Sequence, residues 1–131
     1  MQASVQDLVS TIIPVHNRAQ LVKEAVASVL AQTYRPIEVI IVDDGSTDET
    51  PQAADALMAE NPSEIRVLRQ KNTGPGLARE SGRKAAKGEF IQYLDSDDVL
   101  LPPKFELQVD ALRQRPDCGI EIGRASCRER V

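Results

Sequence analysis

The sequence predicts a single α/β domain with a mostly parallel β-sheet and flanking helices. Between Leu8 and Arg115, short apolar runs typical of buried strands alternate with segments in which apolar residues recur every three or four positions, as on one face of a helix. The chain has 131 residues, of which 41% are hydrophobic, and this suits one domain with one core. Polar and acidic residues directly follow several predicted strands, where open α/β sheets bind ligands.

The first predicted strand runs from Leu8 to Ile13, is rich in β-branched residues and ends at Pro14. A helix is predicted over residues 21–30, because its apolar residues follow the 3.6-residue period. Asn17, with Gln20 three residues later, is the pattern of a capping box at the start of this helix.

The second predicted strand, Ile37 to Val42, is apolar at every position except Glu38, as expected of a central parallel strand. The helix that follows has two candidate N-cap residues, Ser46 and Asp48. Pro51 favours Asp48, because a cap there places the proline in the first turn, where no main-chain hydrogen bond is lost.

The remaining elements follow the same alternation. A third strand is predicted over Ile65 to Leu68 and a helix over about Leu77 to Lys87, with Gly88 as its C-terminal cap. A fourth strand covers Glu89 to Leu94. The last helix is predicted within residues 102–116, between a proline pair and a single proline.

Composition excludes several classes of protein. The 20 acidic residues outnumber the 16 lysines and arginines, and the net charge of −4 argues against a nucleic-acid partner. A membrane span is not expected, since no run of 18 apolar residues occurs, and a secretory leader is not expected, since no basic-then-apolar segment opens the chain. We therefore expect a cytoplasmic protein, free or peripheral to the inner face of the membrane. Cys118 and Cys127 are too few for a disulfide framework.

The segment from Glu121 to Val131, EIGRASCRERV, has neither an apolar period nor turn chemistry. Back-translated, it resembles a translated short-read sequencing adapter, so we predict that it is not part of the fold. The alternative is a genuine basic tail. On the first interpretation the domain comprises residues 1–120 and is incomplete, and its net charge changes from −4 to −5.

The segment Tyr93 to Asp98, YLDSDD, places three carboxylates directly after the fourth strand. In an extended chain Asp95 and Asp97 point to the same side, about 6.6 Å apart. Their repulsion of roughly 0.6 kcal/mol in water, or about 2.5 kcal/mol at an effective dielectric of 20, would be removed by a divalent cation. Asp98 lies on the opposite side of such a chain and is predicted to be a turn or capping residue. The alternative for the cluster is a solvated acidic turn.

Four segments are predicted to line one crevice, because the carboxyl ends of parallel strands share one edge of the sheet. They are Pro14 to Asn17, Asp43 to Ser46, Asn72 to Gly82 and the cluster at Asp95. Their order and spacing resemble the amino-terminal half of family 2 glycosyltransferases, over Val9 to Ile120. The resemblance implies a Rossmann-like nucleotide-diphospho-sugar transferase fold of the A type.

The resemblance also implies a nucleotide base pocket. Asp44, or alternatively Asp43, would accept the N3 hydrogen of a uracil-like base, and Gly45 would permit a tight exit from the strand. The main chain at Pro14 and Val15 would form the floor of the pocket. The alternatives are a solvated acidic turn and a proline that only ends a strand.

Further positions match the family's motif less closely. His16 stands where the family more often has an aromatic residue such as tyrosine, and we expect it to line the ligand or to be structural. For Asn17 we expect a helix cap, and the alternative is a contact with the ligand. Arg79 matches an arginine of the family. It could hold a carboxylate or approach the diphosphate, and the alternative is a surface or structural ion pair. Glu80 replaces a common asparagine.

For the acidic cluster, the resemblance assigns Asp95 to the ribose and Asp97 to a Mg²⁺ or Mn²⁺ ion that bridges the diphosphate. The implied reaction transfers a sugar, with inversion, from a UDP-sugar to a hydroxyl of a saccharide or other acceptor, as in polysaccharide biosynthesis. The family's catalytic base is a carboxylate on a later segment, and no match precedes Glu121. The chain as given is expected to bind a donor without turning it over.

Three other interpretations compete. A nucleotide-sugar-binding module without catalysis would need the same cleft. YLDSDDVL also fits the first motif of haloacid dehalogenase-like phosphatases, with Asp95 as nucleophile and Asp97 as acid or base, although three strands precede it here. Gly74 to Gly76 resembles a dinucleotide-binding loop, but Arg79 occupies its third small-residue position.

Overall fold

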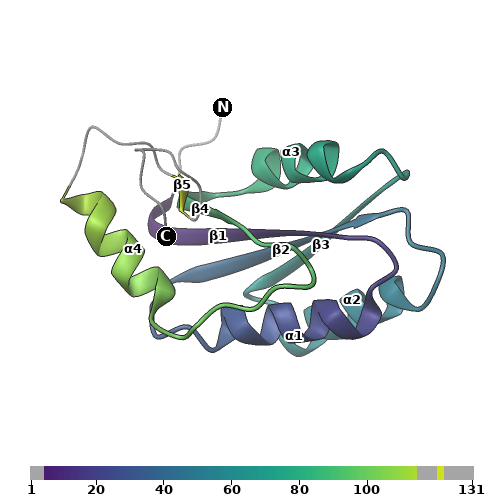
Figure 1. Ribbon diagram of the computed structural model, residues 1–131, viewed down its shortest axis with the longest axis horizontal. Coiled ribbons are helices and arrows are strands. Elements are labelled where there is room, and N and C mark those ends of the chain that lie inside the picture. Colours follow the sequence, from purple (N-terminus) through teal and green to yellow (C-terminus); the bar gives the residue numbers. More distant parts are fainter. Residues whose placement is uncertain (1–4, 115–120, 123–131) are drawn as a thin grey trace.

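The computed structural model describes residues 5–114 and 121–122. Strands and helices alternate along the chain, as predicted (Figure 1). The strands are β1 (Val5–Val15), β2 (Ile37–Asp44), β3 (Ile65–Gln70), β4 (Gly88–Tyr93) and β5 (Glu121–Ile122). The helices are α1 (Ala19–Leu30), α2 (Thr50–Glu60), α3 (Pro75–Ala85) and α4 (Lys104–Arg113).

The strands form one sheet in the order β3-β2-β1-β4-β5, and every neighbouring pair is parallel. The central strand β1 pairs on both sides, with Ile12 opposite Ile40 in β2 and opposite Tyr93 in β4. All eight residues of β2 are buried, which explains its nearly continuous apolar sequence. The predicted α/β class with a parallel sheet is confirmed.

The helices cover both faces of the sheet, with α3 on one side and α1, α2 and α4 on the other (Figure 1). Alternate side chains of β1 pack against the helices on the two faces of the sheet, because side chains along a strand point to opposite faces. Val9 and Ile13 pack in the larger core with α1 and α4, whereas Ile12 packs in the smaller core with Ala78 of α3.

Helix α3 lies very close to the sheet at Gly82. A Cβ atom on this residue would lie 2.4 Å from Cγ2 of Ile12 and 3.2 Å from Cγ2 of Val42. Real Cβ atoms do not approach other atoms so closely, and the glycine therefore sets the spacing between α3 and the sheet.

Glu38 is the one charged residue in the otherwise apolar run Ile37 to Val42 of β2, and its buried carboxylate joins three strands. It accepts hydrogen bonds from Ser10 Oγ of β1 at 2.5 Å and from the backbone N–H of Lys87 at 2.8 Å. Arg66 of β3 donates to its other oxygen at 3.1 Å. Full pairing of this kind offsets the cost of burying a carboxylate.

Two predicted caps are wrong. Helix α1 has Arg18 at its N-cap and no side-chain cap hydrogen bond, because Asn17 has a φ of 54° and bonds to another loop. Gly88 does not end α3, whose C-cap is Ala86, but begins β4. A Cβ on Gly88 would lie 2.5 Å from Ser10 Oγ, so close packing against β1 explains this glycine.

Asp48 was predicted as the N-cap of α2, but the helix begins one residue later than that prediction requires. The N-cap position is Glu49, without a side-chain cap bond, but Oδ1 of Asp48 accepts a hydrogen bond from the N–H of Thr50 at 2.8 Å. Hydrogen bonding with Thr50 holds the pKa of Asp48 below its usual value. The proline in the first turn is tolerated, as predicted.

The predicted domain boundary at residue 120 stays a prediction. Strand β5 consists of the first two residues of the adapter-like segment and pairs with β4 at Ile91 and Gln92. The rest of that segment, both cysteines and Pro116 lie outside the described residues. Among the helices of the described part of the chain, none is both long and apolar enough to cross a membrane.

Candidate functional site

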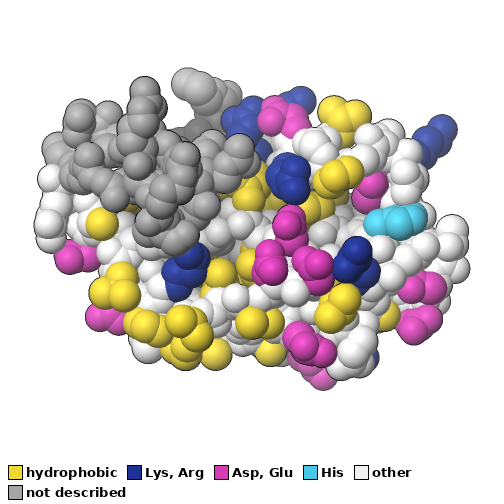
Figure 2. Space-filling model, viewed as in Figure 1, with side chains coloured by type: hydrophobic (Ala, Val, Ile, Leu, Met, Phe, Trp, Pro, Cys, Tyr) yellow, Lys and Arg dark blue, Asp and Glu magenta, His cyan; other side chains and the backbone are white. Residues whose placement is uncertain are grey.

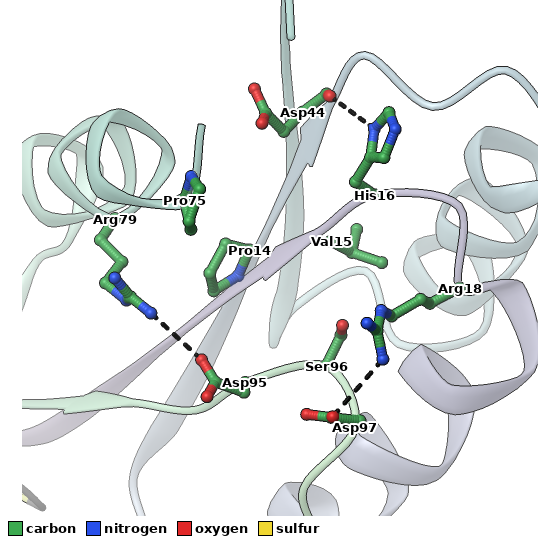
Figure 3. Close-up of a pocket in the computed structure, with 10 residues that line it drawn as sticks. All are labelled: Pro14, Val15, His16, Arg18, Asp44, Pro75, Arg79, Asp95, Ser96 and Asp97. Atoms are coloured by element: carbon green, nitrogen blue, oxygen red, sulfur yellow. Dashed lines mark hydrogen bonds and ion pairs between the residues drawn. The ribbon is translucent and has the colours of Figure 1, made fainter. Parts of the chain in front are cut away.

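A cleft of about 400 Å³ opens at the carboxyl edge of the sheet (Figure 3). It is formed by the ends of β1 and β2, the turn after β4 and the first turns of α3. The lining residues are Pro14, Val15, His16, Arg18, Asp44, Pro75, Arg79, Asp95, Ser96 and Asp97. The predicted crevice is therefore present, and six of the eight predicted site residues line it. Asn17 and Asp43 do not.

The acidic segment after β4 is a tight turn. The N–H of Asp98 donates to the carbonyl of Asp95 at 3.0 Å, and carboxylate oxygens of Asp95, Asp97 and Asp98 lie within 4.8 Å of one another. The prediction that Asp98 points away from the other two is wrong, because it assumed an extended chain. Asp98 is a turn residue, as expected, but its carboxylate joins the cluster.

The donor set of this acidic turn fits a divalent cation such as Mg²⁺ or Mn²⁺. Three carboxylates supply hard oxygen ligands, and their exposure leaves room for the water molecules that such ions retain. Figure 2 shows a group of acidic side chains near the middle of this face, with basic side chains beside it.

Two arginines pair with the acidic turn from opposite sides (Figure 3). Arg79 of α3 lies 3.3 Å from Asp95, and Arg18, at the start of α1, lies 3.4 Å from Asp97. For Arg79 this is the surface ion pair named as the alternative, and its approach to a diphosphate stays a prediction. Arg18 was missed, although it directly follows the predicted Pro14 to Asn17 segment and has the charge that an acidic site needs.

Asp44 lines the cleft while its carboxylate holds the loop before α3. Oδ1 accepts from the N–H of Thr73 and from Gln70 Nε2, each at 2.9 Å, and Oδ2 accepts from the N–H of Gly74 at 3.0 Å. Burial acts to raise the pKa of Asp44, but these hydrogen bonds outweigh it, and the pKa lies below its usual value. Asp44 is therefore a fixed carboxylate at neutral pH.

The neighbouring Asp43 has a structural role in the turn that follows β2. It is 2% exposed, and its Oδ1 accepts a hydrogen bond from the N–H of Ser46 at 3.1 Å. Gly45 has a φ of 74°, and a Cβ there would lie 2.7 Å from the backbone nitrogen of Asn72. The predicted tight exit at Gly45 is confirmed, and of the two aspartates only Asp44 faces the cleft.

The loop after β1 is tied to the loop after β2. Oδ1 of Asn17 accepts from the N–H of Thr47 at 2.8 Å, and its own N–H donates to Ser46 Oγ at 2.9 Å. His16 Nδ1 lies 2.9 Å from the carbonyl oxygen of Asp44 and 3.1 Å from Nδ2 of Asn72. Asn17 acts by joining loops, whereas His16 also lines the cleft.

Pro75 and Ser96 also line the cleft, within two of the segments predicted to do so, although neither was singled out as a site residue. Pro75 is the first residue of α3, and Ser96 lies between the two predicted aspartates. Their neighbours along the chain were the only signal in the sequence.

Fold and site define an α/β domain with a charged ligand cleft at the carboxyl edge of its sheet. Residues 10–126 match the family model of Glycosyl transferase family 2. The chain belongs to this family, and the predicted resemblance is confirmed. The family assignment decides against the haloacid dehalogenase and dinucleotide-binding interpretations.

Relatives of known sequence in bacteria are named as glycosyltransferases. The chain is 37% identical over 120 residues to glycosyltransferase GlyG of Streptococcus pneumoniae, covering 91% of this chain and 39% of that protein. It is 42% identical over 106 residues to an uncharacterized glycosyltransferase of Rickettsia felis, covering 81% of this chain and 17% of that protein. The chain thus spans less than half the length of these relatives.

Solved structures with the same arrangement include glycosyltransferase complexes. TarS 1–349 of S. aureus in complex with UDP superposes with a TM-score of 0.73 at 30% identity, over 81% of this chain and 32% of that one. The mannosyltransferase PcManGT of Pyrobaculum calidifontis, in complex with GDP-Man and Mn²⁺, gives 0.66 at 28% identity, over 70% and 28%.

Proposed function

We propose that this chain is the donor-binding part of an inverting, metal-dependent glycosyltransferase that uses a UDP-sugar. The observation that carries the proposal is the juxtaposition of the acidic turn with Asp44 and two arginines in one cleft. A nucleoside diphosphate sugar has matching parts, since its base needs a fixed acceptor and its diphosphate needs positive charge.

Each carboxylate then has a distinct role. Asp44 accepts the N3 hydrogen of the base, using Oδ2, which has one donor among the described residues, the N–H of Gly74 at 3.0 Å, and so retains acceptor capacity. Asp95 contacts the ribose, and Asp97 holds Mg²⁺ or Mn²⁺ with support from Asp98. The cation would neutralise charge on the departing nucleoside diphosphate.

Support for uridine comes from TarS, which is solved in complex with UDP and with UDP-GlcNAc. The metal is supported by the PcManGT complex, which contains Mn²⁺ together with GDP-Man. Because these two proteins bind different bases, UDP and GDP are the pair of ligands to compare.

The acceptor hydroxyl must lose a proton as the sugar is transferred, and this requires a base. We assign none of the described residues to that role. Asp44 is held by the loop before α3, and Asp95 and Asp97 are paired with arginines. We propose that the base is a carboxylate on a later segment of the full protein and that this chain binds donor without transferring it.

Calorimetry with UDP-GlcNAc, UDP and GDP, in Mn²⁺ and again in EDTA, tests the proposal. We expect binding of the uridine ligands in Mn²⁺, weaker binding of GDP, and a large loss in EDTA. Equal affinities with and without the metal would contradict the metal assignment, and preference for GDP would contradict the assignment of the base.

The competing function is a nucleotide-sugar-binding module without catalysis, which would give the same calorimetry. A transfer assay on the complete protein separates the two. Release of UDP that depends on an added acceptor supports the transferase, and its absence over a panel of hydroxyl acceptors supports the module.

A further inference from the structure

The two arginines at the acidic turn approach it from separate elements of the fold. Arg79 projects from α3 toward Asp95, whereas Arg18 projects from the start of α1 toward Asp97, so that the turn lies between them (Figure 3). Both pairs open to solvent, with side-chain exposures of 47% and 52% for Arg18 and Asp97. Exposed ion pairs of this kind contribute little to stability, and a competing ion can replace either partner.

The charges of this arrangement favour a cation first and an anion second. Three carboxylates and two guanidinium groups leave one net negative charge at the turn. A diphosphate is repelled by that charge, while a divalent cation is attracted. Binding of the cation changes the sign of the net charge, and the diphosphate is then attracted.

We propose that Arg18 is an exchangeable counter-ion of Asp97, which pairs with this carboxylate in the free protein and moves to the diphosphate when a divalent cation is bound. This inference rests on the proposed function. Arg18 competes directly with the cation because it pairs with Asp97, the proposed metal ligand, whereas Arg79 pairs with Asp95. Arg18 thereby makes metal and nucleotide binding interdependent.

The backbone around Arg18 allows its side chain to be changed without disturbing the fold. The N–H of Arg18 donates to Thr50 Oγ1 at 3.0 Å, and its carbonyl accepts from the N–H of Val22 at 2.9 Å. Both contacts belong to the main chain and remain after substitution. The guanidinium is held by Asp97 alone among the described contacts.

The test is a titration of Arg18→Gln with Mn²⁺ alone, with UDP alone, and with UDP at saturating Mn²⁺. Without its competitor, Asp97 should bind Mn²⁺ roughly twofold to fivefold more tightly. UDP at saturating Mn²⁺ should bind about tenfold more weakly, because one charge-assisted hydrogen bond is lost. In the wild type, UDP raises the affinity for Mn²⁺ and Mn²⁺ raises the affinity for UDP by the same factor. In Arg18→Gln both enhancements should therefore decrease equally.

Two variants control for charge and for shape. Lys84→Gln removes one positive charge from the exposed last turn of α3, away from the lining of the cleft, and should bind both ligands as the wild type does. Arg18→Lys keeps the positive charge and should retain most of the competition with Mn²⁺ for Asp97. Part of the UDP affinity should be lost, because lysine lacks the planar guanidinium group that can donate two hydrogen bonds to a phosphate.

The outcomes separate this inference from the proposed function. If the wild type binds UDP only with Mn²⁺ and Arg18→Gln is indistinguishable from Lys84→Gln, the counter-ion role is overturned and the proposed function stands. If the wild type binds no Mn²⁺, with or without UDP, the metal-dependent function is itself contradicted. Tighter Mn²⁺ binding by Arg18→Gln alone, with no UDP binding by any variant, supports only the competition of Arg18 with the cation for Asp97. It overturns both the move of Arg18 to the diphosphate and the donor assignment.

Discussion

Oδ1 of Asp44 accepts a hydrogen bond from the backbone N–H of Thr73 at 2.9 Å, which ties the end of β2 to the loop before α3. The two residues are 29 positions apart, and the bond joins two walls of the cleft. A single carboxylate thus organises the loop and also faces the ligand site.

Asp44→Ala should therefore affect both stability and binding. The change leaves the N–H groups of Thr73 and Gly74 without their acceptor, and we expect a loss of about 1–3 kcal/mol in the free energy of unfolding. UDP affinity should also fall. Urea unfolding and calorimetry measure the two effects. UDP affinity equal to that of the wild type would contradict the base assignment even if the protein is less stable.

The stabilisation by Asp44 should depend on pH. The pKa of Asp44 is lower in the folded state than its usual value, so its contribution is complete above the unfolded pKa of about 3.9 and is lost as the pH falls through the folded pKa. The stability difference between wild type and Asp44→Asn should be constant from about pH 5 to 7 and should decrease below about pH 4. A difference that persists to about pH 2 would contradict the depressed pKa.

Asp97→Ala should abolish Mn²⁺-dependent binding of UDP-sugars and leave the fold intact, because its side chain is half exposed. The loss of one of three carboxylate ligands should weaken Mn²⁺ binding by about tenfold or more. Calorimetry with metal and with EDTA measures this. The control is Glu24→Ala, which removes a carboxylate from the exposed face of α1. Similar Mn²⁺ affinity in the two variants would show that Asp97 is not a ligand.

Gly82→Ala should destabilise the protein by about 1–3 kcal/mol, since the added methyl group would overlap Ile12 and α3 would have to move from the sheet. Gly76→Ala in the same helix is the matched control, because a Cβ there meets nothing within 4 Å. Thermal or urea unfolding of both variants tests this. Equal stabilities would refute the close approach of α3 to β1.

Glu38→Gln should lower the free energy of unfolding by about 1–3 kcal/mol, because a neutral amide is a weaker acceptor for Arg66 and its NH₂ group opposes the N–H of Lys87. UDP affinity of the folded protein should be unchanged, since Glu38 and Asp44 are about 20 Å apart along β2. Glu24→Gln, on the exposed face of α1, is the control. A selective loss of UDP binding would place Glu38 in the site.

Much of the fold and the position of the site could be predicted because they depend on local patterns. The strand-like runs from Leu8 and from Ile37 became the two central strands, β1 and β2. Since parallel strands end at one edge, the segments after them had to meet there, and Asp44 and Asp97 do line one cleft.

The predictions that failed concerned the shape of the chain between elements. Asp98 was placed by the alternation of an extended chain, but a turn closed by its bond to Asp95 brings its carboxylate into the cluster. Gly88 has the sequence context of a helix cap, but its close neighbour is Ser10, far away in sequence.

The sequence by itself determined the α/β class, the family and the edge of the sheet that carries the site, because periodicity and motif spacing are properties of neighbouring residues. Only the tertiary structure decided how the charges of the site are paired. Arg18 and Asp97 are 79 positions apart, and their contact depends on the packing of α1 against the sheet that contains β4. Contacts between distant residues have no local signal, and the function we propose for Arg18 depends on one of them.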